Sequence, residues 1–299
     1  MDSMARISER LAENAAGEFY VDRTCIDCDA CRQIAPAVFG RSDSVGQSYV
    51  HRQPADAQET HRALMALVTC PTASIGTAHQ TNATAAARSF PEPVEGEVYY
   101  CGFAAESSFG ASSYFIRRPE GNVLVDSPRA AGPLMKRLAE LGGVRWMFLT
   151  HRDDVADHRK FARAFKCERI LHRADLTGQS ADVERIVEGT DPVHLADDLV
   201  VIPVPGHTRG SSSLLYRDTF LFAGDHLWGA DGEDELEASR SVCWYSWPEQ
   251  VRSLAKLREF SFRWVLPGHG RRLGAKSAEQ MRDWLTRLLE QIGPVSARH

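Results

Sequence analysis

The sequence predicts an α+β protein of two domains, and three observations support this fold class. The chain has 299 residues, which exceeds the usual size of a single domain. From Val98 onward, short β-rich runs alternate with a few helical stretches, a pattern typical of stacked sheets covered by helices. A cysteine-containing unit precedes them, separated by a polar Ala-, Thr- and Pro-rich stretch. We therefore expect domains at residues 1–78 and 95–299, joined by a linker at 79–94.

The expected elements follow from these patterns in chain order. The first domain is expected to contain a strand, a cysteine loop, a short helix, a second strand near 47–51 and a helix near 58–68. In the second domain, helical spacing of apolar residues predicts four helices among the β-rich runs. These helices are expected at residues 132–141, 158–165, 248–260 and 275–292.

Composition and charge argue against several classes of protein. The hydrophobic fraction of 43% and the charged fraction of 25% are those of an ordinary globular protein. The net charge is −5 without a basic run, so we expect no nucleic-acid partner. No apolar run reaches the ~20 residues of a membrane span. Residues 1–20 predict a short amphipathic helix rather than a signal or transit segment. We therefore expect no membrane association and a cytoplasmic location.

Four of the seven cysteines have the spacing of an iron–sulfur site. Cys25, Cys28 and Cys31 are separated by two residues each, and Cys70 is followed directly by Pro71. Three thiolates at this spacing can surround one cubane cluster, and a distant fourth completes its coordination. Zinc sites prefer two separate Cys-x2-Cys pairs, which this pattern lacks. The four cysteines therefore predict a cluster and a reducing compartment rather than a disulfide scaffold.

The cysteine pattern and the sequence Ala-Pro-Ala-Val-Phe at 35–39 give residues 17–78 a family resemblance. This stretch resembles a single-cluster bacterial ferredoxin. Because no aspartate replaces the second cysteine, the resemblance implies one [4Fe-4S] cluster rather than a [3Fe-4S] cluster. It also implies that the cluster either exchanges electrons with a redox partner protein or senses oxidation.

Polar residues follow five apolar strands in the second half of the chain. These residues are Asp126, His151, His207, Asp225 and His269. Glycine precedes the last three, and glycine permits the tight turns that aim side chains at a common point. Residues at strand ends lie at the edge of a sheet, so we expect these side chains to converge there.

The segments Pro-Gly-His-Thr, Ala-Gly-Asp and Pro-Gly-His-Gly give residues 95–275 a second resemblance. This region resembles the metallo-β-lactamase superfamily, particularly its glyoxalase II-like hydrolases, whose fold is an αβ/βα sandwich with metals at the sheet edges. The resemblance implies a first metal at His151 and His207 and a second at Asp157, His158 and His269. It also implies that Asp225 bridges the metals and that Asp126 orients their ligands. Asp157 and Asp225 would then be the catalytic residues.

One departure from the family pattern changes the expected metal. The family motif is His-x-His-x-Asp-His, whereas this chain has His151-x-Asp153-x-x-x-Asp157-His158, two residues longer. Asp153 is therefore a further candidate ligand. An extra carboxylate favours iron or manganese over zinc and weakens the Lewis acidity that activates water. We expect one or two zinc or iron ions, with manganese as a further option.

Three functions remain open at this stage. The first is a metal-dependent hydrolase of an ester, thioester or amide bond in a small-molecule substrate. The second is an oxidoreductase in which the cluster feeds electrons to a non-haem iron site. Flavodiiron proteins share the second fold and keep a carboxylate in the motif, although this chain has no flavodoxin-like domain. The third is a non-enzymatic iron–sulfur sensor. Residues 244–248, rich in aromatics, are expected either to begin a helix or to form a substrate-pocket wall.

Overall fold

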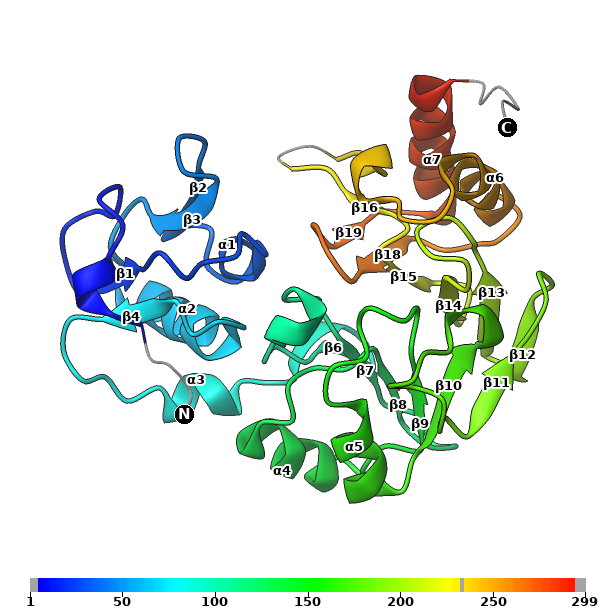
Figure 1. Cartoon of the computed structure of the whole chain (residues 1–299), viewed down its shortest axis with the longest axis horizontal. Helices are drawn as coiled ribbons and strands as arrows, with labels where there is room; N and C mark the ends of the chain where they lie inside the picture. The colour runs from blue at the N-terminus through cyan, green and yellow to red at the C-terminus, as the bar shows by residue number, and fades with distance from the viewer. Residues whose placement is uncertain (1–4, 232–233, 294–299) are drawn as a thin grey trace. The chain divides into compact units, whose positions relative to one another are not determined.

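A computed structural model describes residues 5–231 and 234–293 of the chain (Figure 1). Helices and short strands are mixed, so the α+β class expected from the sequence is confirmed. The chain divides into two compact units. The first comprises Met1–Arg145 and Ala156–Cys167, and the second comprises Trp146–Val155 and Glu168–His299. This division passes through the second predicted domain.

The cysteine region of the first unit is built from two small antiparallel sheets and two helices. Strand β1 pairs with β4, and β2 pairs with β3. Helix α2 begins at an N-cap, Asp56, whose side chain accepts a hydrogen bond from the Glu59 amide. The bounds are β1 Phe19–Val21, α1 Ala30–Ile34, β2 Phe39–Ser42, β3 Gln47–Val50, α2 Ala57–Thr69 and β4 Ile75–Thr77.

The prediction of an N-terminal amphipathic helix is wrong for the described residues of that segment. Only one 3-10 turn, η1 (Ile7–Glu9), forms before β1. Leu11 is buried but Ile7 is 57% exposed, so the apolar residues do not share one face. Asn14 holds the segment in an irregular path instead. Its side chain donates to the carbonyls of Leu11 and Val21 and accepts from the amides of Val21 and Val50.

The stretch 79–94, expected to be an unstructured linker, contains a helix and a strand. Helix α3 spans Thr84–Arg88, and β5 (Glu92–Glu95) pairs with β6 (Val98–Tyr100). Alanine has the highest helix propensity, and Ala86 and Phe90 are almost fully buried. The apolar residues are too few to give a periodic pattern, which is why the sequence did not reveal these elements.

The remainder of the first unit is an antiparallel ladder with flanking helices. Its strands pair in the order β5-β6-β7-β8. Strands β7 and β8 are buried along their whole length. The bounds are η2 Glu106–Ser108, β7 Tyr114–Ile116, β8 Val123–Val125, α4 Gly132–Glu140 and α5 His158–Phe165.

The second unit contains a parallel ladder and a six-stranded sheet. Strand β10 pairs in parallel with both β9 and β11. The six strands follow the order β12-β13-β14-β15-β18-β19, with β15 and β18 parallel. The ladder strands are β9 Trp146–Phe148, β10 Glu168–His172 and β11 Arg185–Val187, with η3 Arg173–Asp175 after β10. The sheet strands are β12 Val193–Ala196, β13 Leu199–Pro203, β14 Ser212–Tyr216, β15 Phe220–Gly224, β18 Trp264–Pro267 and β19 Leu273–Gly274. A two-stranded pair, β16 Trp228–Gly229 and β17 Leu236–Glu237, and the turn η4 Arg240–Val242 complete the unit.

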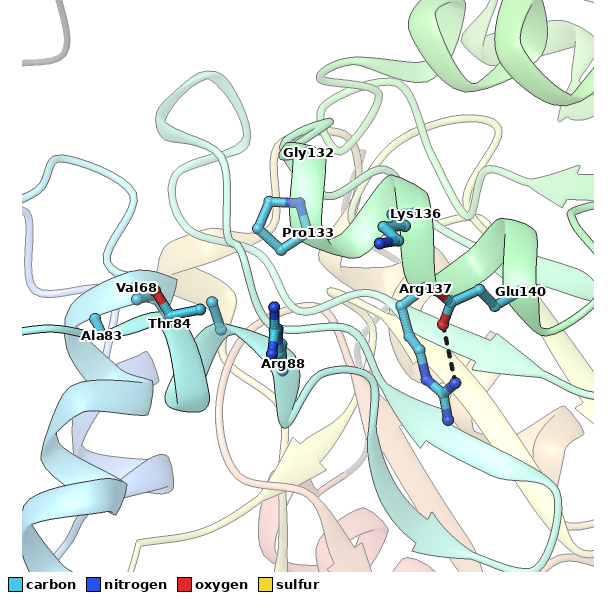
Figure 2. Close-up of a pocket in the computed structure, with 10 residues that line it drawn as sticks. Val68, Ala83, Thr84, Arg88, Gly132, Pro133, Lys136, Arg137 and Glu140 are labelled. Carbon is cyan, nitrogen blue, oxygen red and sulfur yellow. Dashed lines mark hydrogen bonds and ion pairs between the residues drawn. The ribbon is translucent and has the colours of Figure 1, made fainter.

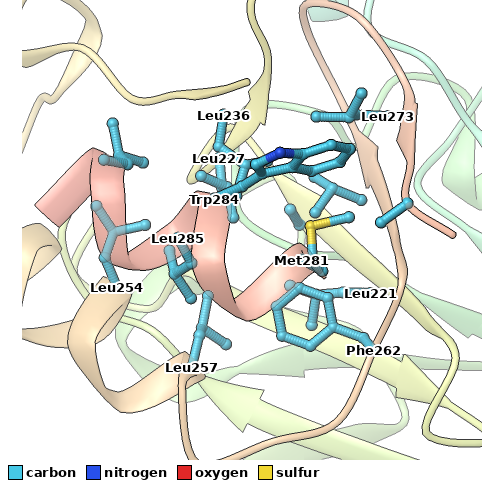
Figure 3. Packing of buried hydrophobic residues seen from close by; sticks show 14 of the residues in the cluster. Leu221, Leu227, Leu236, Leu254, Leu257, Phe262, Leu273, Met281, Trp284 and Leu285 are labelled. Carbon is cyan, nitrogen blue, oxygen red and sulfur yellow. The ribbon is translucent and has the colours of Figure 1, made fainter. Parts of the chain in front are cut away.

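Helices α6 (Trp247–Leu257) and α7 (Ala278–Ile292) cover this sheet with an apolar core (Figure 3). Trp284 and Met281 of α7 and Leu254 of α6 lie in the same buried cluster as Leu221 of β15. Truncating one such leucine to alanine typically costs about 2–5 kcal/mol. This packing fixes the strands whose ends carry the predicted metal ligands.

The four helices expected in the second half of the chain are confirmed as α4, α5, α6 and α7. Within residues 5–231 and 234–293, none of the helices combines the length and the apolar character needed to cross a membrane.

Candidate metal centres

The four predicted cluster ligands meet around one small cavity of the first unit. Cys25 and Cys28 lie in the loop after β1, Cys31 lies in α1, and Cys70 is the C-cap of α2. All four side chains line the cavity together with apolar residues and Ser48. The arrangement can hold a compact inorganic group with one thiolate on each vertex.

The two aspartates between the cysteines explain how the loop turns so tightly. Asp27 and Asp29 have φ angles of 57° and 62°, a left-handed conformation that aspartate adopts more readily than most residues. The carboxylate of Asp27 also pairs with Arg32 at 2.7 Å and with Arg41 at 2.8 Å. Asp27 and Asp29 are therefore a local sequence signal of the tight loop, in addition to the spacing of the cysteines.

Burial of the thiols is the main electrostatic feature of this cavity. It raises the pKa of Cys28 to about 12 and raises the pKa of Cys31 well above its usual value. Such thiols ionise only when a cation compensates the burial. The Ser74 amide donates to Cys70 Sγ at 3.3 Å, and the backbone also donates to Cys25 and Cys28. Four cysteines around one cavity, three of them with amide donors, fit an iron–sulfur cluster, whose potential such bonds tune.

The second group of candidate ligands lies in the second unit, at the ends of strands. His151 follows β9 and His207 lies between β13 and β14. Asp225 follows β15 directly, and His269 lies just beyond β18. The structure therefore brings these four predicted ligands into one region of the sheet edge.

One carboxylate oxygen is central to this site. Asp225 Oδ2 lies 3.6 Å from His151 Nε2, 3.6 Å from His207 Nε2 and 3.8 Å from His269 Nε2. Two ligands of a tetrahedral zinc at about 2.0 Å are about 3.3 Å apart. The observed separations are therefore only slightly wider than those around a bound metal.

Two aspartates after His151 add further oxygens. Asp153 Oδ2 lies 3.7 Å from His207 Nε2 and 4.0 Å from His151 Nε2. Asp154 Oδ2 lies 4.0 Å from His151 Nε2. Among the described residues, His151, Asp153 and His207 form one group that could hold a metal, and His151, Asp154 and Asp225 form another. Sequence reasoning named Asp153 but missed Asp154, although the adjacent acids directly after His151 were the available signal.

The histidines are oriented as metal ligands usually are. His207 Nδ1 lies 2.7 Å from the Val242 carbonyl oxygen, and His151 Nδ1 lies 3.0 Å from Thr150 Oγ1. Within the described part of the chain, the buried Nε2 atoms of His151 and His207 have no hydrogen-bond partner. Fixing one ring nitrogen while the other faces a polar centre is the usual arrangement at metals. The residues present therefore fit a divalent metal ion.

The charge states of these groups also suit a metal. Burial lowers the pKa of His151 and so favours the neutral imidazole, which can donate a lone pair to a metal. Burial would raise the pKa of Asp225, but the electrostatic influence of the neighbouring imidazoles, that of His269 first, outweighs it and lowers that pKa. For His207, burial is outweighed by the nearby carboxylates of Asp153 and Asp225, which raise its pKa. A bound cation would replace the proton on His207.

Two glycines allow the site to close tightly. A Cβ atom on Gly268 would lie 2.5 Å from Asp225 Oδ1 and 2.8 Å from Asp154 Oδ2. Gly224 has a φ angle of +54°, and a Cβ there would lie 2.6 Å from Thr150 Oγ1. Both positions therefore require the absence of a side chain.

Asp175 is a buried residue that sequence reasoning missed. Its Oδ1 accepts from the Gly210 amide at 2.7 Å, and its Oδ2 accepts from the Arg152 amide and the Thr208 hydroxyl. It thus ties the loop that carries His151 to the loop that carries His207. Its position in the turn η3, with no motif around it, gave no sequence signal.

Three predicted residues belong to the first unit and lie in neither candidate group. Asp157 precedes α5, and its carboxylate accepts from the Ala130 amide at 2.8 Å and pairs with Lys160 at 2.9 Å. His158 and Asp126 are buried. The ligand, catalytic and orienting roles implied for these three residues by family resemblance stay predictions.

The first unit also has a surface groove with a volume of about 790 Å³ (Figure 2). It is lined by parts of α2, α3 and α4, including Arg88, Lys136 and Arg137. Arg137 pairs with Glu140 at 3.2 Å. None of the predicted cluster or metal ligands lines the groove, and its charged side chains are exposed. We therefore place neither centre there.

Comparisons with known proteins match a family in the cysteine region and a fold in the rest of the chain. Residues 21–77 match the family described as the 4Fe-4S single cluster domain of Ferredoxin I. A metallo-β-lactamase family protein from Thermus thermophilus is similar in structure, with 18% identity over 67% of this chain and 80% of that chain and a TM-score of 0.50. A comparison with curated proteins finds no significant match.

Two further solved structures are more distant in fold. An archaeal metallo-β-lactamase superfamily protein from Sulfolobus tokodaii has 17% identity over 69% of this chain and 90% of that chain, with a TM-score of 0.47. A subclass B3 metallo-β-lactamase of Bradyrhizobium japonicum has 16% identity over 67% and 90%, with a TM-score of 0.45.

The chain therefore combines a region that matches the single-cluster 4Fe-4S family with a metallo-β-lactamase-like fold. The fold class expected from the sequence, a ferredoxin-like domain followed by an αβ/βα metallo-β-lactamase sandwich, is confirmed. At 18% identity, the structural match establishes the fold and leaves the reaction open.

Proposed function

We propose that this protein is a metal-dependent hydrolase that cleaves an ester, thioester or amide bond of a small molecule. The observation that carries the proposal is the position of Asp225 Oδ2, within 3.8 Å of three imidazole Nε2 atoms. The buried, unpartnered Nε2 atoms of His151 and His207 support it. A cluster in the N-terminal region accompanies this activity and either contacts a redox partner protein or responds to oxidation.

The residues of the chain have distinct roles in this proposal. One metal would be held by His151, His207 and Asp153. Asp225 would bind either that metal alone or both that metal and a second metal at His269. The metal supplies Lewis acidity and lowers the pKa of bound water. Asp175 keeps the loops of His151 and His207 at a fixed spacing through its three hydrogen bonds. Asp157, which the family resemblance implies to be catalytic, would orient the attacking water.

Turnover of generic thioesters and esters by anaerobically purified protein tests the proposal. We expect activity with zinc or another divalent ion, and we expect its loss in Asp225→Ala and His269→Ala. Replacing the four cluster cysteines should leave turnover in place. If the cysteines prove essential while the fold is intact, the hydrolase proposal is wrong.

A second candidate function, an iron-dependent oxidoreductase, is favoured by one observation. Asp153 places a carboxylate oxygen 3.7 Å from His207 Nε2, where the family motif has histidine. Oxygen ligands favour iron or manganese. This candidate predicts iron in excess of acid-labile sulfide and little zinc. It also predicts that chemical reduction of the cluster is followed by a spectral change at a second iron, and the absence of such transfer would exclude it.

A further inference from the structure

A loop outside the ferredoxin region lies directly against one cluster cysteine. A Cβ atom built on Gly110 would lie 2.4 Å from Cys28 Cβ, 2.8 Å from Cys28 Sγ and 3.3 Å from Pro71 Cγ. Real Cβ atoms essentially never approach other atoms closer than 3.0 Å. The backbone of Gly110 therefore occupies space next to Cys28 that no residue with a side chain could share. The matched ferredoxin region ends at residue 77, so Gly110 lies well outside it.

Other contacts hold this loop against the cysteine region. The Ala104 amide donates to the Thr69 carbonyl at 3.1 Å, one residue before Cys70. Arg129 Nη2 donates to the Val68 carbonyl at 2.9 Å. All these residues belong to the first unit. The approach of Gly110 to Cys28 is thus one of several contacts between the two segments.

Backbone hydrogen bonds within the loop hold it in one conformation, so it can act as a rigid cover. It spans residues 105–111, and the Gly110 amide donates to the Ala105 carbonyl at 2.9 Å. The Ala111 amide donates to the Ser108 carbonyl at 2.9 Å. Ala105, Ser108 and Ala111 are buried. Gly110 has a φ angle of +86°, which glycine adopts without strain.

We propose that Gly110 is a cluster-site residue that the metallo-β-lactamase part of the chain contributes. Its backbone covers the Cys28 side of the cluster and excludes water and oxidants from the iron bound there. Solvent exposure is one of the factors that set the potential of an iron–sulfur cluster. The lifetime of the cluster in air and its reduction potential therefore depend on a loop that precedes β7. This inference rests on the 4Fe-4S domain and not on the proposed hydrolase, so it stands or fails separately from that activity.

The test compares Gly110→Ala with Gly96→Ala in the full chain. Both glycines have positive φ angles, but a Cβ on Gly96 would meet nothing within 4 Å. Both variants therefore carry backbone strain, and only Gly110→Ala intrudes on Cys28. The three proteins are purified anaerobically and assayed for iron, acid-labile sulfide, bleaching of the cluster absorption in air and reduction potential.

We expect Gly110→Ala to bleach several-fold faster than the parent and to show a shifted potential, while Gly96→Ala behaves like the parent. Equal bleaching rates and potentials for the two variants would overturn the proposal. Circular dichroism establishes whether each variant is folded.

A measurement on the unchanged protein covers the case in which Gly110→Ala does not fold. Hydrogen exchange is compared between the cluster-loaded chain and the same chain after chelation of its iron. We expect the amides of residues 108–111 to exchange faster once the cluster is removed, in parallel with those of residues 25–31. Faster exchange confined to the cysteine region, with no change at 108–111, would contradict the cover.

Discussion

The cluster region and the candidate hydrolytic site of this protein assemble their ligands in opposite ways. Three of the four cluster cysteines lie within seven consecutive residues, 25–31, and the fourth is a helix C-cap in the same small fold. The ligands around Asp225 come from four separate strand ends, between residues 151 and 269. A local centre is encoded by spacing, whereas a dispersed centre depends on how strands pair and pack.

The two regions also differ in how burial acts on their ligands. Burial raises the pKa of the Cys28 and Cys31 thiols, which favours their protonated form until a cation binds. At the other site, burial lowers the pKa of His151 and so favours the form that binds metal. The thiols of the first site ionise only when a strongly charged group binds. At the second site, His151 already favours the neutral form that can bind a divalent ion. Their responses to mutation and metal removal should therefore be separable.

The largest expected effect is at the local centre. Cys28→Ser removes one of the four cluster thiolates. No fifth cysteine among the described residues lines the cavity to replace it. We expect complete or nearly complete loss of iron and acid-labile sulfide, with the second metal and turnover retained. Cys101→Ser is the control, because Cys101 is a buried thiol that lies outside the cavity. Loss of the second metal in folded Cys28→Ser would show that the two centres are not independent.

Asp225→Ala should have the largest effect at the dispersed centre. It removes the oxygen that lies within 3.8 Å of three imidazoles. We expect metal affinity and turnover to fall by about 100-fold or more, since even indirect partners of metal ligands contribute 10–100-fold. Metal titration followed by calorimetry measures this, with cluster iron unchanged. Asp231→Ala, at an exposed position, serves as control, and a parent-like affinity in Asp225→Ala would reject the site.

Asp175→Asn tests whether loop positioning is needed at the dispersed centre. The amide keeps the shape of the side chain but turns one accepting oxygen into a donor, which then opposes either the Gly210 amide or the Arg152 amide and the Thr208 hydroxyl. We expect about a 10–100-fold loss of metal affinity and little change in cluster content. Asp198→Asn, which weakens an ion pair with Arg217, is the comparison. An affinity equal to that of Asp198→Asn would mean that Asp175 is not required.

Asp157→Asn should give the smallest effect, because Lys160 and the Ala130 amide already contact its carboxylate. We expect turnover to fall by about tenfold, less than the ~10²–10⁴-fold that a general acid or base typically contributes. Lys160→Ala removes the ion pair alone and should reduce turnover less. If both variants have the same turnover, the catalytic role predicted for Asp157 is wrong and its carboxylate serves the start of α5.

The sequence by itself determined the class of fold and the residues of the local centre. The cysteines within residues 25–31 lie close together whatever the arrangement of the rest of the chain, because seven residues can fold around one cluster without distant contacts. The glycines before His207, Asp225 and His269 similarly marked strand ends, since tight turns are a local property. Alternating β-rich runs and helical stretches indicated stacked sheets for the same reason.

Only the tertiary structure decided which other residues join these centres. Asp154 and Asp175 reach the dispersed site through contacts between loops, and Gly110 reaches Cys28 from a distant part of the chain. The structure in 79–94 likewise depends on the burial of Ala86 and Phe90 against distant residues. Local patterns fix backbone turns over a few residues, whereas contacts between segments follow from strand pairing and packing of the whole chain, which no short stretch contains.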